Sequence, residues 1–314
     1  MFLSFRRYML HLFVCVIFEN KKHIVRAHSI KNNKLIHTYE KTFESEEKLL
    51  GYVKTLVNDF QLYYISVFFD RQIQGIVPCV NSKDMSGYGV NPSNVFSINI
   101  ANARLYSSIN SINELKKKFE YCGGLDFAFS PLALLYYCIS KEKNIENKLR
   151  LYIYRHSNCI AVMICKAKDI CFGSFFDLSP KESALENKES TTVEKEENKE
   201  IEDANIENYD LDKLDNLLDE KLDDMQYTSS AKINLGDFSN DMQMCSYIFM
   251  SIKEFYNNPL YKGNFIDDIV LYDNENISNA VLSYIESELF LKPKLVQIDT
   301  LELMNELMRK ELKV

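Results

Sequence analysis

The sequence predicts an α/β protein built from two halves with the same order of elements. Each half reads strand, strand, strand, helix, strand, helix, strand, helix, and the second half begins at about residue 148. Short apolar runs alternate with amphipathic helical patterns, which is typical of sheets covered by helices. A run of three strand patterns opens each half, so the order repeats without obvious sequence identity. The last strand and helix of the first half are the weakest part of this repeat.

The charge distribution separates one tract from the rest of the chain. The 314 residues carry a net charge of −8, and residues 181–224 alone hold 17 acidic and 6 basic side chains. The remainder therefore sums to +3. Proteins that bind nucleic acid present a basic surface rich in arginine, whereas only 8 of the 37 basic residues here are arginine. We therefore expect no nucleic-acid partner.

The cysteines and the N-terminus both indicate a cytoplasmic protein. Eight cysteines occur without a CxxC pair, mostly inside apolar runs, which favours reduced, buried thiols. Residues 9–18 are apolar after Arg6 and Arg7, an order that signal peptides share. This run is too short to span a bilayer and has no cleavage site. It is interpreted as a buried first strand behind a basic, aromatic leader that touches a membrane surface weakly or not at all.

The first half has an insertion after its fourth strand. A helix is expected to begin at the capping box Ser111–Glu114 and to end at Gly123–Gly124, and Ser130–Pro131 begins the next helix. The aromatic residues of the insertion either cover its own small core or pack against a neighbouring molecule; they are Tyr88, Phe96 and Tyr106. The expected elements are strands at 12–18, 22–30 and 33–39, a helix at 45–60, a strand at 62–70, the insertion at 71–110, a strand at 125–129 and a helix at 131–141.

The second half has its insertion after the third strand, at 178–238. Residues 181–205 have almost no apolar content, so we expect disorder there. Residues 206–225 repeat Leu and Met at helical spacing, and this helix docks on its own domain, binds a partner groove or stays unfolded. The expected elements are strands at 149–155, 158–166 and 169–177, a helix at 240–257, a strand at 266–272, a helix at 277–289, a strand at 293–297 and a helix capped by Asp299.

Three runs resemble a known family. They are Tyr64–Phe69 leading to Ile76-Val77-Pro78, the helix–strand–helix junction Glu120–Leu134, and the hairpins of Leu151–Asp177. In this order they resemble PilM and the cytoplasmic part of GspL, in the actin-like ATPase superfamily. The resemblance implies an actin-like (ribonuclease H-like) duplicated βββαβαβα fold with two lobes, 1–147 and 148–314. It also places the 71–110 insertion where the PilM and FtsA branch has a small inserted subdomain.

The same resemblance implies a cytoplasmic scaffold at the inner membrane of a bacterium. PilM-like proteins bind a cytoplasmic segment of a PilN-like bitopic inner-membrane protein and assemble into rings or arches. They do so under type IV pilus or type II secretion machines, and a co-opted flagellar motor scaffold is a related use. GspL continues into a transmembrane helix, whereas this sequence shows none, which favours a free-standing PilM-like protein.

The resemblance also locates three turns that hold nucleotide in active relatives. Glycine is needed there because backbone N–H groups must approach the phosphates closely. None of the three turns contains glycine; their residues are Glu19, Asn20 and Lys21, then Arg155, His156 and Ser157, then Asp273 and Asn274. We therefore expect no catalytic residue, no cofactor and no tight ATP binding. The basic residues of the first two turns either attract an anion or are solvated.

Other catalytic chemistry lacks support in the sequence. There is no GxxxxGK[ST] loop, and the five histidines show no zinc-binding spacing, so no metal site is expected. Two alternatives to the scaffold stay open: a nucleotide-binding actin-like ATPase that regulates such a machine, and a sugar-kinase-like enzyme. The enzyme needs a catalytic aspartate near the cleft. The nearest acid after the second turn is Asp169, in a hairpin tip.

Overall fold

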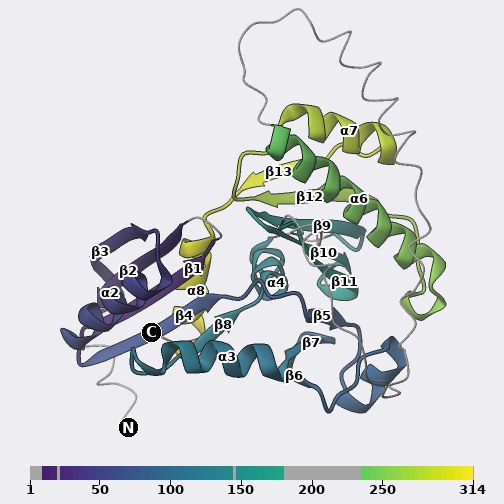
Figure 1. Ribbon diagram of the computed structural model, residues 1–314. Helices are drawn as coiled ribbons and strands as arrows, with labels where there is room; N and C mark the ends of the chain where they lie inside the picture. Colours follow the sequence, from purple (N-terminus) through teal and green to yellow (C-terminus); the bar gives the residue numbers. More distant parts are fainter. Residues whose placement is uncertain (1–8, 20–21, 144–145, 180–234, 314) are drawn as a thin grey trace, which may run out of the picture. The chain divides into compact units, whose positions relative to one another are not determined.

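The structure is a computed structural model that describes residues 9–19, 22–143, 146–179 and 235–313. The predicted leader, most of the acidic insertion at 178–238 and its amphipathic helix at 206–225 lie outside these residues. The described strands form two five-stranded sheets and one three-stranded sheet (Figure 1).

The two large sheets have the same topology. The first has the order β3-β2-β1-β4-β8 and the second the order β11-β10-β9-β12-β13. In each, three antiparallel strands are followed by two parallel ones. The first comprises β1 (His11–Phe18), β2 (His23–Lys31), β3 (Lys34–Phe43), β4 (Leu62–Phe68) and β8 (Phe127–Phe129); the second comprises β9 (Leu149–His156), β10 (Cys159–Lys166), β11 (Asp169–Asp177), β12 (Asp268–Asp273) and β13 (Lys294–Gln297).

The predicted order of elements is confirmed in both halves. Between and after the strands lie α2 (Glu46–Asn58), α3 (Ile109–Glu120) and α4 (Pro131–Lys141) in the first half, and α6 (Leu235–Asn257), α7 (Asn279–Leu289) and α8 (Thr300–Leu312) in the second. The last strand and helix of the first half, the weakest part of the sequence pattern, are formed as β8 and α4. Both halves therefore read βββαβαβα.

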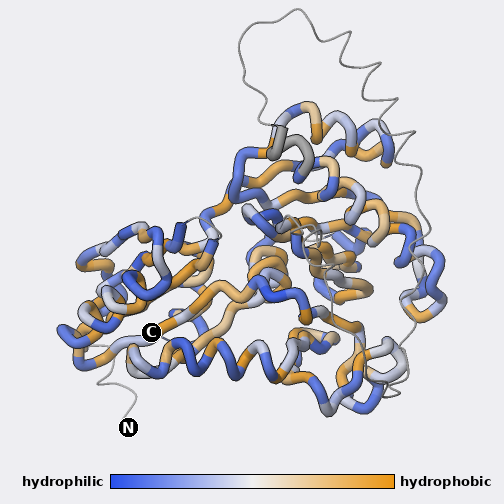
Figure 2. Tube along the Cα trace, viewed as in Figure 1, coloured by the Kyte–Doolittle hydropathy of each residue, from blue (hydrophilic) through white to orange (hydrophobic). Residues whose placement is uncertain are grey.

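The central strands of both large sheets are covered on both faces, and this covering forms the layers of the molecule. Leu12, Val14 and Val16 of β1 pack with α2 and α3, whereas Phe13 and Cys15 face the opposite side. That opposite side forms one core with α4, α8 and the facing side of the second sheet. The outer face of the second sheet packs against α6 and α7. Figure 2 shows apolar residues concentrated along the strands and along α4. Strands buried on both faces produce the near-continuous apolar runs seen in the sequence.

The helix caps agree with the sequence at three places and differ at two. Ser130 and Asp299 accept hydrogen bonds from Leu132 N and Glu302 N, as expected of N-caps. Gly123 and Gly124 adopt φ of 100° and 110° after α3, a conformation that glycine favours. The predicted capping box at Ser111 is wrong, because α3 begins at Ile109. Ser108 caps it instead, and its side chain accepts from Ser111 N. Ser45 precedes α2 without a capping side-chain bond.

The insertion forms the three-stranded sheet and contacts the second half. Its elements are β5 (Gln74–Val77), the 3₁₀ helix η1 (Ser82–Tyr88), β6 (Val95–Ile100) and β7 (Ala103–Ser108), in the sheet order β5-β7-β6. Asn102 pairs with the main chain of β11: its Nδ2 donates to Ile170 O at 3.0 Å and its Oδ1 accepts from Ile170 N at 2.8 Å. Ile76 of β5 packs over Gly173 of β11, where a Cβ would collide with it.

Candidate functional site

The candidate site lies at the carboxyl ends of central strands from both sheets. Ligands of open α/β sheets bind at this end. Glu19 follows β1, His156 ends β9 and Glu275 follows β12. One ligand atom from each of these three side chains lies within 4.8 Å of the other two. The structure therefore brings together residues from all three turns that the sequence analysis identified. Asn20 and Lys21 lie outside the described residues.

The second turn is not solvated, which corrects one of the two sequence interpretations. Arg155 donates from Nη2 to Asp241 Oδ1 at 2.6 Å, and its Nη1 lies 3.6 Å from Asp273 Oδ1. His156 is only 3 % exposed. Both residues belong to β9 and pack inward, because the hairpin turn itself is only Ser157–Asn158. Arg155 is already engaged with two carboxylates, so its charge is not free to attract an anion, and the second interpretation is weakened too.

The third turn is built around Asp273. This aspartate is fully buried, and its carboxylate accepts from Ile277 N at 2.7 Å and from Glu275 N at 3.2 Å. The neighbouring Asn274 accepts at Oδ1 from Thr300 N, at 3.0 Å, which ties the turn to the start of α8. In the structure Asp273 and Asn274 hold the turn in place.

His156 is kept neutral by its surroundings. Burial lowers the pKa of His156 to about 4, and the ammonium of Lys22 contributes in the same direction. The Phe68 ring at the end of β4 packs against the imidazole, with ring centroids 4.6 Å apart. Ser157 Oγ lies 3.3 Å from His156 Nδ1. The site therefore contains an uncharged imidazole with an aromatic ring beside it.

Two carboxylates lie beside this imidazole, and the sequence analysis missed a further one, Asp70, that acts on Glu19. Burial raises the pKa of Glu19, and the negative charges of Glu275 and Asp70 act in the same direction. Burial also raises the pKa of Asp70 to about 6, and Asp177 contributes. Asp70 lies two residues after the buried strand β4, a position that could have identified it. Asp169, by contrast, sits at the distal start of β11, opposite Lys166.

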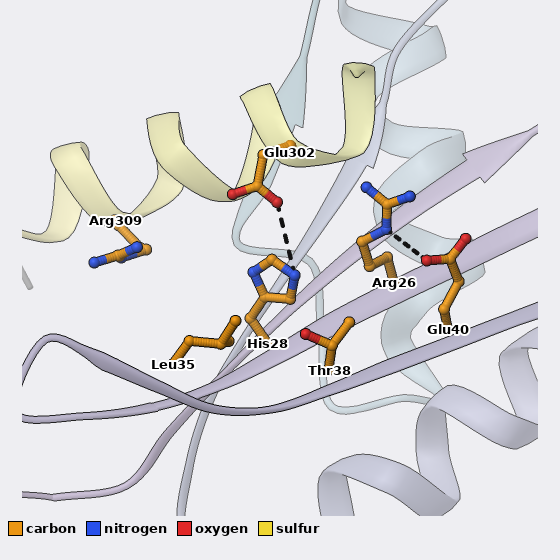
Figure 3. Close-up of a pocket in the computed structure, with 7 residues that line it drawn as sticks. All are labelled: Arg26, His28, Leu35, Thr38, Glu40, Glu302 and Arg309. Carbon is orange, nitrogen blue, oxygen red and sulfur yellow. Dashed lines mark hydrogen bonds and ion pairs between the residues drawn. The ribbon is translucent and has the colours of Figure 1, made fainter. Parts of the chain in front are cut away.

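A separate pocket lies between the edge of the first sheet and α8 (Figure 3). Its volume is about 330 Å³. Two of its cations face carboxylates: Arg26 Nε donates to Glu40 at 2.9 Å, and His28 Nε2 lies 3.7 Å from Glu302. The buried Nε of Arg309 has no hydrogen-bond partner among the described residues. None of its lining residues belongs to the three turns; they are Arg26, His28, Leu35, Thr38, Glu40, Glu302 and Arg309. Because Glu40 and Glu302 already face Arg26 and His28, this pocket is a weaker candidate site than the turns.

The cysteines offer no activated nucleophile. All eight are free, and every one except Cys171 is buried, as the sequence predicted. Burial raises the pKa of Cys15 to about 12 and acts in the same direction on Cys159 and Cys165. A nucleophilic cysteine needs the opposite shift, because the thiolate is the reactive form.

Solved structures of low sequence identity have the same fold. A protein of actin-like ATPase fold and unknown function from Bacteroides thetaiotaomicron VPI-5482 aligns over 100 % of this chain and 99 % of its own, with 8 % identity and a TM-score of 0.51. The PilM–PilN type IV pilus biogenesis complex aligns over 94 % of each chain, with 10 % identity and a TM-score of 0.53. These matches confirm the predicted actin-like fold and, at the level of fold, the predicted resemblance to PilM.

No helix in the described part of the chain has both the length and the hydropathy needed to cross a membrane.

Sequence comparison gives the family. Among proteins of curated function, none matches this sequence. A family model described as a domain of unknown function, DUF8569, matches residues 9–136. A second one, also described as a domain of unknown function, DUF8341, matches residues 151–313. Because this second match covers more than half of the chain, the protein belongs to the DUF8341 family.

Proposed function

We propose that this protein is a non-catalytic, PilM-like cytoplasmic scaffold. In this role it binds the cytoplasmic segment of a PilN-like bitopic protein at the inner membrane of a bacterium and assembles into a ring or arch. Such an assembly sits under an envelope-spanning machine, a type IV pilus, a type II secretion system or a flagellar motor. The likeness in fold to PilM of the PilM–PilN complex motivates the choice of partner.

One observation carries the non-catalytic part of the proposal. The three turns that hold nucleotide in active relatives converge here, and they bring the carboxylates of Glu19 and Glu275 close to a buried imidazole. A triphosphate needs backbone N–H groups and positive charge at this place, and two carboxylates oppose it. Arg155 is held by Asp241 and Asp273, so it is not available to a phosphate.

The inserted subdomain offers a surface for a partner. Among the described strands, β6 pairs with β7 alone and therefore lies at the edge of its sheet, where Phe96 and Ile98 have exposed fractions of 57 % and 46 %. Tyr88 and Tyr106 instead pack into the small core of the insertion. An edge strand with exposed apolar side chains is a template for another chain. We therefore assign partner binding or self-association to β6.

The test is co-purification from native cells with a tag at the C-terminus, after mild solubilisation of membranes. The proposal expects a small bitopic membrane protein in the eluate, and expects its loss when Phe96→Asp and Ile98→Asp are combined. Phe265→Asp is the matched control, because Phe265 is 71 % exposed and lies outside the insertion. The assignment would be contradicted if no membrane protein were recovered, or if the wild type, the double variant and the Phe265→Asp control recovered equal amounts of it.

Asp70 favours a second candidate, a nucleotide-hydrolysing regulator of the same kind of machine. A carboxyl whose pKa is about 6 at the end of β4 is suited to general-base catalysis near neutral pH. This candidate requires that the purified protein bind Mg²⁺·ATP and that Asp70→Asn abolish hydrolysis while binding persists.

A further inference from the structure

The strongest unassigned feature is the set of three side chains at the meeting point of the two halves. Glu19 belongs to the first half, and His156 and Glu275 belong to the second. Their ligand atoms lie within 4.8 Å of one another. Ligand atoms on a tetrahedral zinc ion are about 3.5 Å apart, because Zn–N and Zn–O bonds are about 2.0–2.2 Å long. Side-chain rotations that move each ligand atom by about 1 Å are therefore enough to bring all three onto one ion.

The chemistry of this set favours a borderline divalent ion. It offers one imidazole nitrogen and two carboxylates, and an imidazole suits zinc and neighbouring transition metals better than it suits Mg²⁺ or Ca²⁺. The imidazole of His156 is only 3 % exposed and lies within reach of both carboxylates, so its ring is held in place for an ion. The hydroxyl of Ser157 lies beside the imidazole and hydrogen-bonds to Glu19, so it orients two of the three ligands.

The local electrostatics point in the same direction. Glu19 and Glu275 repel each other, and Asp70 adds further negative potential. Asp177 lies close enough to Asp70 to act on its carboxyl. Arg155 is engaged with Asp241 and Asp273. Among the described residues, the cation that acts on this cluster is Lys22, which lowers the pKa of both Glu19 and His156. Lys22 is exposed on a long side chain and can therefore move away when an ion enters.

We propose that Glu19, His156 and Glu275 bind a divalent transition-metal ion that links the two halves of the protein. The ion takes the place that the turns no longer offer to a nucleotide, and water completes its coordination. Because one ligand comes from the first half and two from the second, the ion stabilises their association. This inference does not depend on the proposed scaffold role, since a metal link is compatible with any partner.

The test is a titration of the full-length, EDTA-treated and dialysed protein with Zn²⁺, followed by calorimetry. The proposal expects one ion per chain and a thermal midpoint that rises with Zn²⁺ concentration. Glu19→Gln and Glu275→Gln each weaken binding by more than about tenfold. Lys22→Met has the opposite effect and tightens binding, because it removes the competing charge. Cys171→Ser is the control for thiol binding, since Cys171 is the cysteine that is not buried.

Substitution with Co²⁺ identifies the ligand types independently. The expected absorption spectrum shows ligand-field bands without a thiolate charge-transfer band. His156→Gln is expected to lose binding, and the two glutamine variants above keep the test decisive if His156→Gln does not fold. The proposal is overturned if Zn²⁺ does not bind, if the glutamine variants bind it as tightly as the wild type, or if Mg²⁺ competes equally.

Discussion

The guanidinium of Arg155 lies 3.6 Å from the carboxylate of Asp273, a side chain with no exposed surface. This pair joins the end of β9 to the end of β12, and Asp241 of α6 binds the same guanidinium. The turns after these two strands correspond, by the resemblance described above, to turns that hold nucleotide in active relatives. Here they are joined to each other by an ion pair.

We predict that Arg155→Met destabilises the protein by about 3 kcal/mol or more. The substitution leaves the Asp273 carboxylate buried without its cation, which is the costly way to break a buried pair. The measurement is the free energy of unfolding from urea denaturation. Lys148→Met is the control, because Lys148 pairs with the exposed Glu146. This variant should have nearly the same free energy of unfolding as the wild type. Equal transitions for wild type and Arg155→Met would contradict the prediction.

We predict that Asp70→Asn stabilises the protein above pH 6. Burial raises the pKa of Asp70 from 3.8 to about 6, so the folded state retains a proton that the unfolded chain has lost. Stability of the wild type therefore falls as pH rises through this window, by on the order of 3 kcal/mol. The difference between variant and wild type should grow from pH 4 to pH 6 and then level off. A difference independent of pH would count against the assignment.

His156 should produce the opposite pH slope. Burial lowers its pKa from 6.5 to about 4, so the unfolded chain binds a proton that the folded state refuses. The corresponding stability is present above pH 6.5 and is lost as pH falls towards 4. We predict that this slope is present in the wild type and absent in His156→Gln. Denaturation in EDTA over this range measures it, and parallel profiles for the two proteins would show that His156 is not the titrating group.

The contact between the insertion and the second sheet depends on a glycine. A side chain at position 173 would collide with Ile76, so Gly173→Val should separate β5 from β11 or distort both. Overpacking of this kind costs about 1–3 kcal/mol, and we expect a lower thermal midpoint and faster proteolysis of residues 71–110. Gly87→Ala is the matched control, because a Cβ there meets nothing within 4 Å. A Gly173→Val protein as stable as the control would refute this contact.

The sequence predicted the topology because burial leaves a direct pattern. Strands such as β1, buried on both faces, appear as apolar runs, and the helices between them show one apolar face. The start of α3 was misplaced because Ser108 and Ser111 are both good N-caps, and only the preceding strand β7 decides between them. Local sequence cannot show where a preceding strand ends.

The candidate site was predicted less completely. The sequence identified the turns of Glu19, His156 and Asp273, but it left open whether the basic residues of the first two turns attract an anion or are solvated. His156 is buried because Phe68, from another strand of the other sheet, packs against it. The grouping of Glu19, His156 and Glu275 could not be predicted, because the ligands come from three turns far apart in sequence and form no spacing motif.

The central claim is that the turns of this actin-like fold no longer hold a nucleotide. Calorimetric titration of the purified full-length protein with Mg²⁺·ATP tests it most directly, together with analysis of the denatured protein for co-purified nucleotide. We predict no saturable heat up to millimolar ATP and no nucleotide released on denaturation. Binding of one ATP per chain, weakened by a charge reversal at Lys22, would contradict the account and favour the nucleotide-dependent regulator.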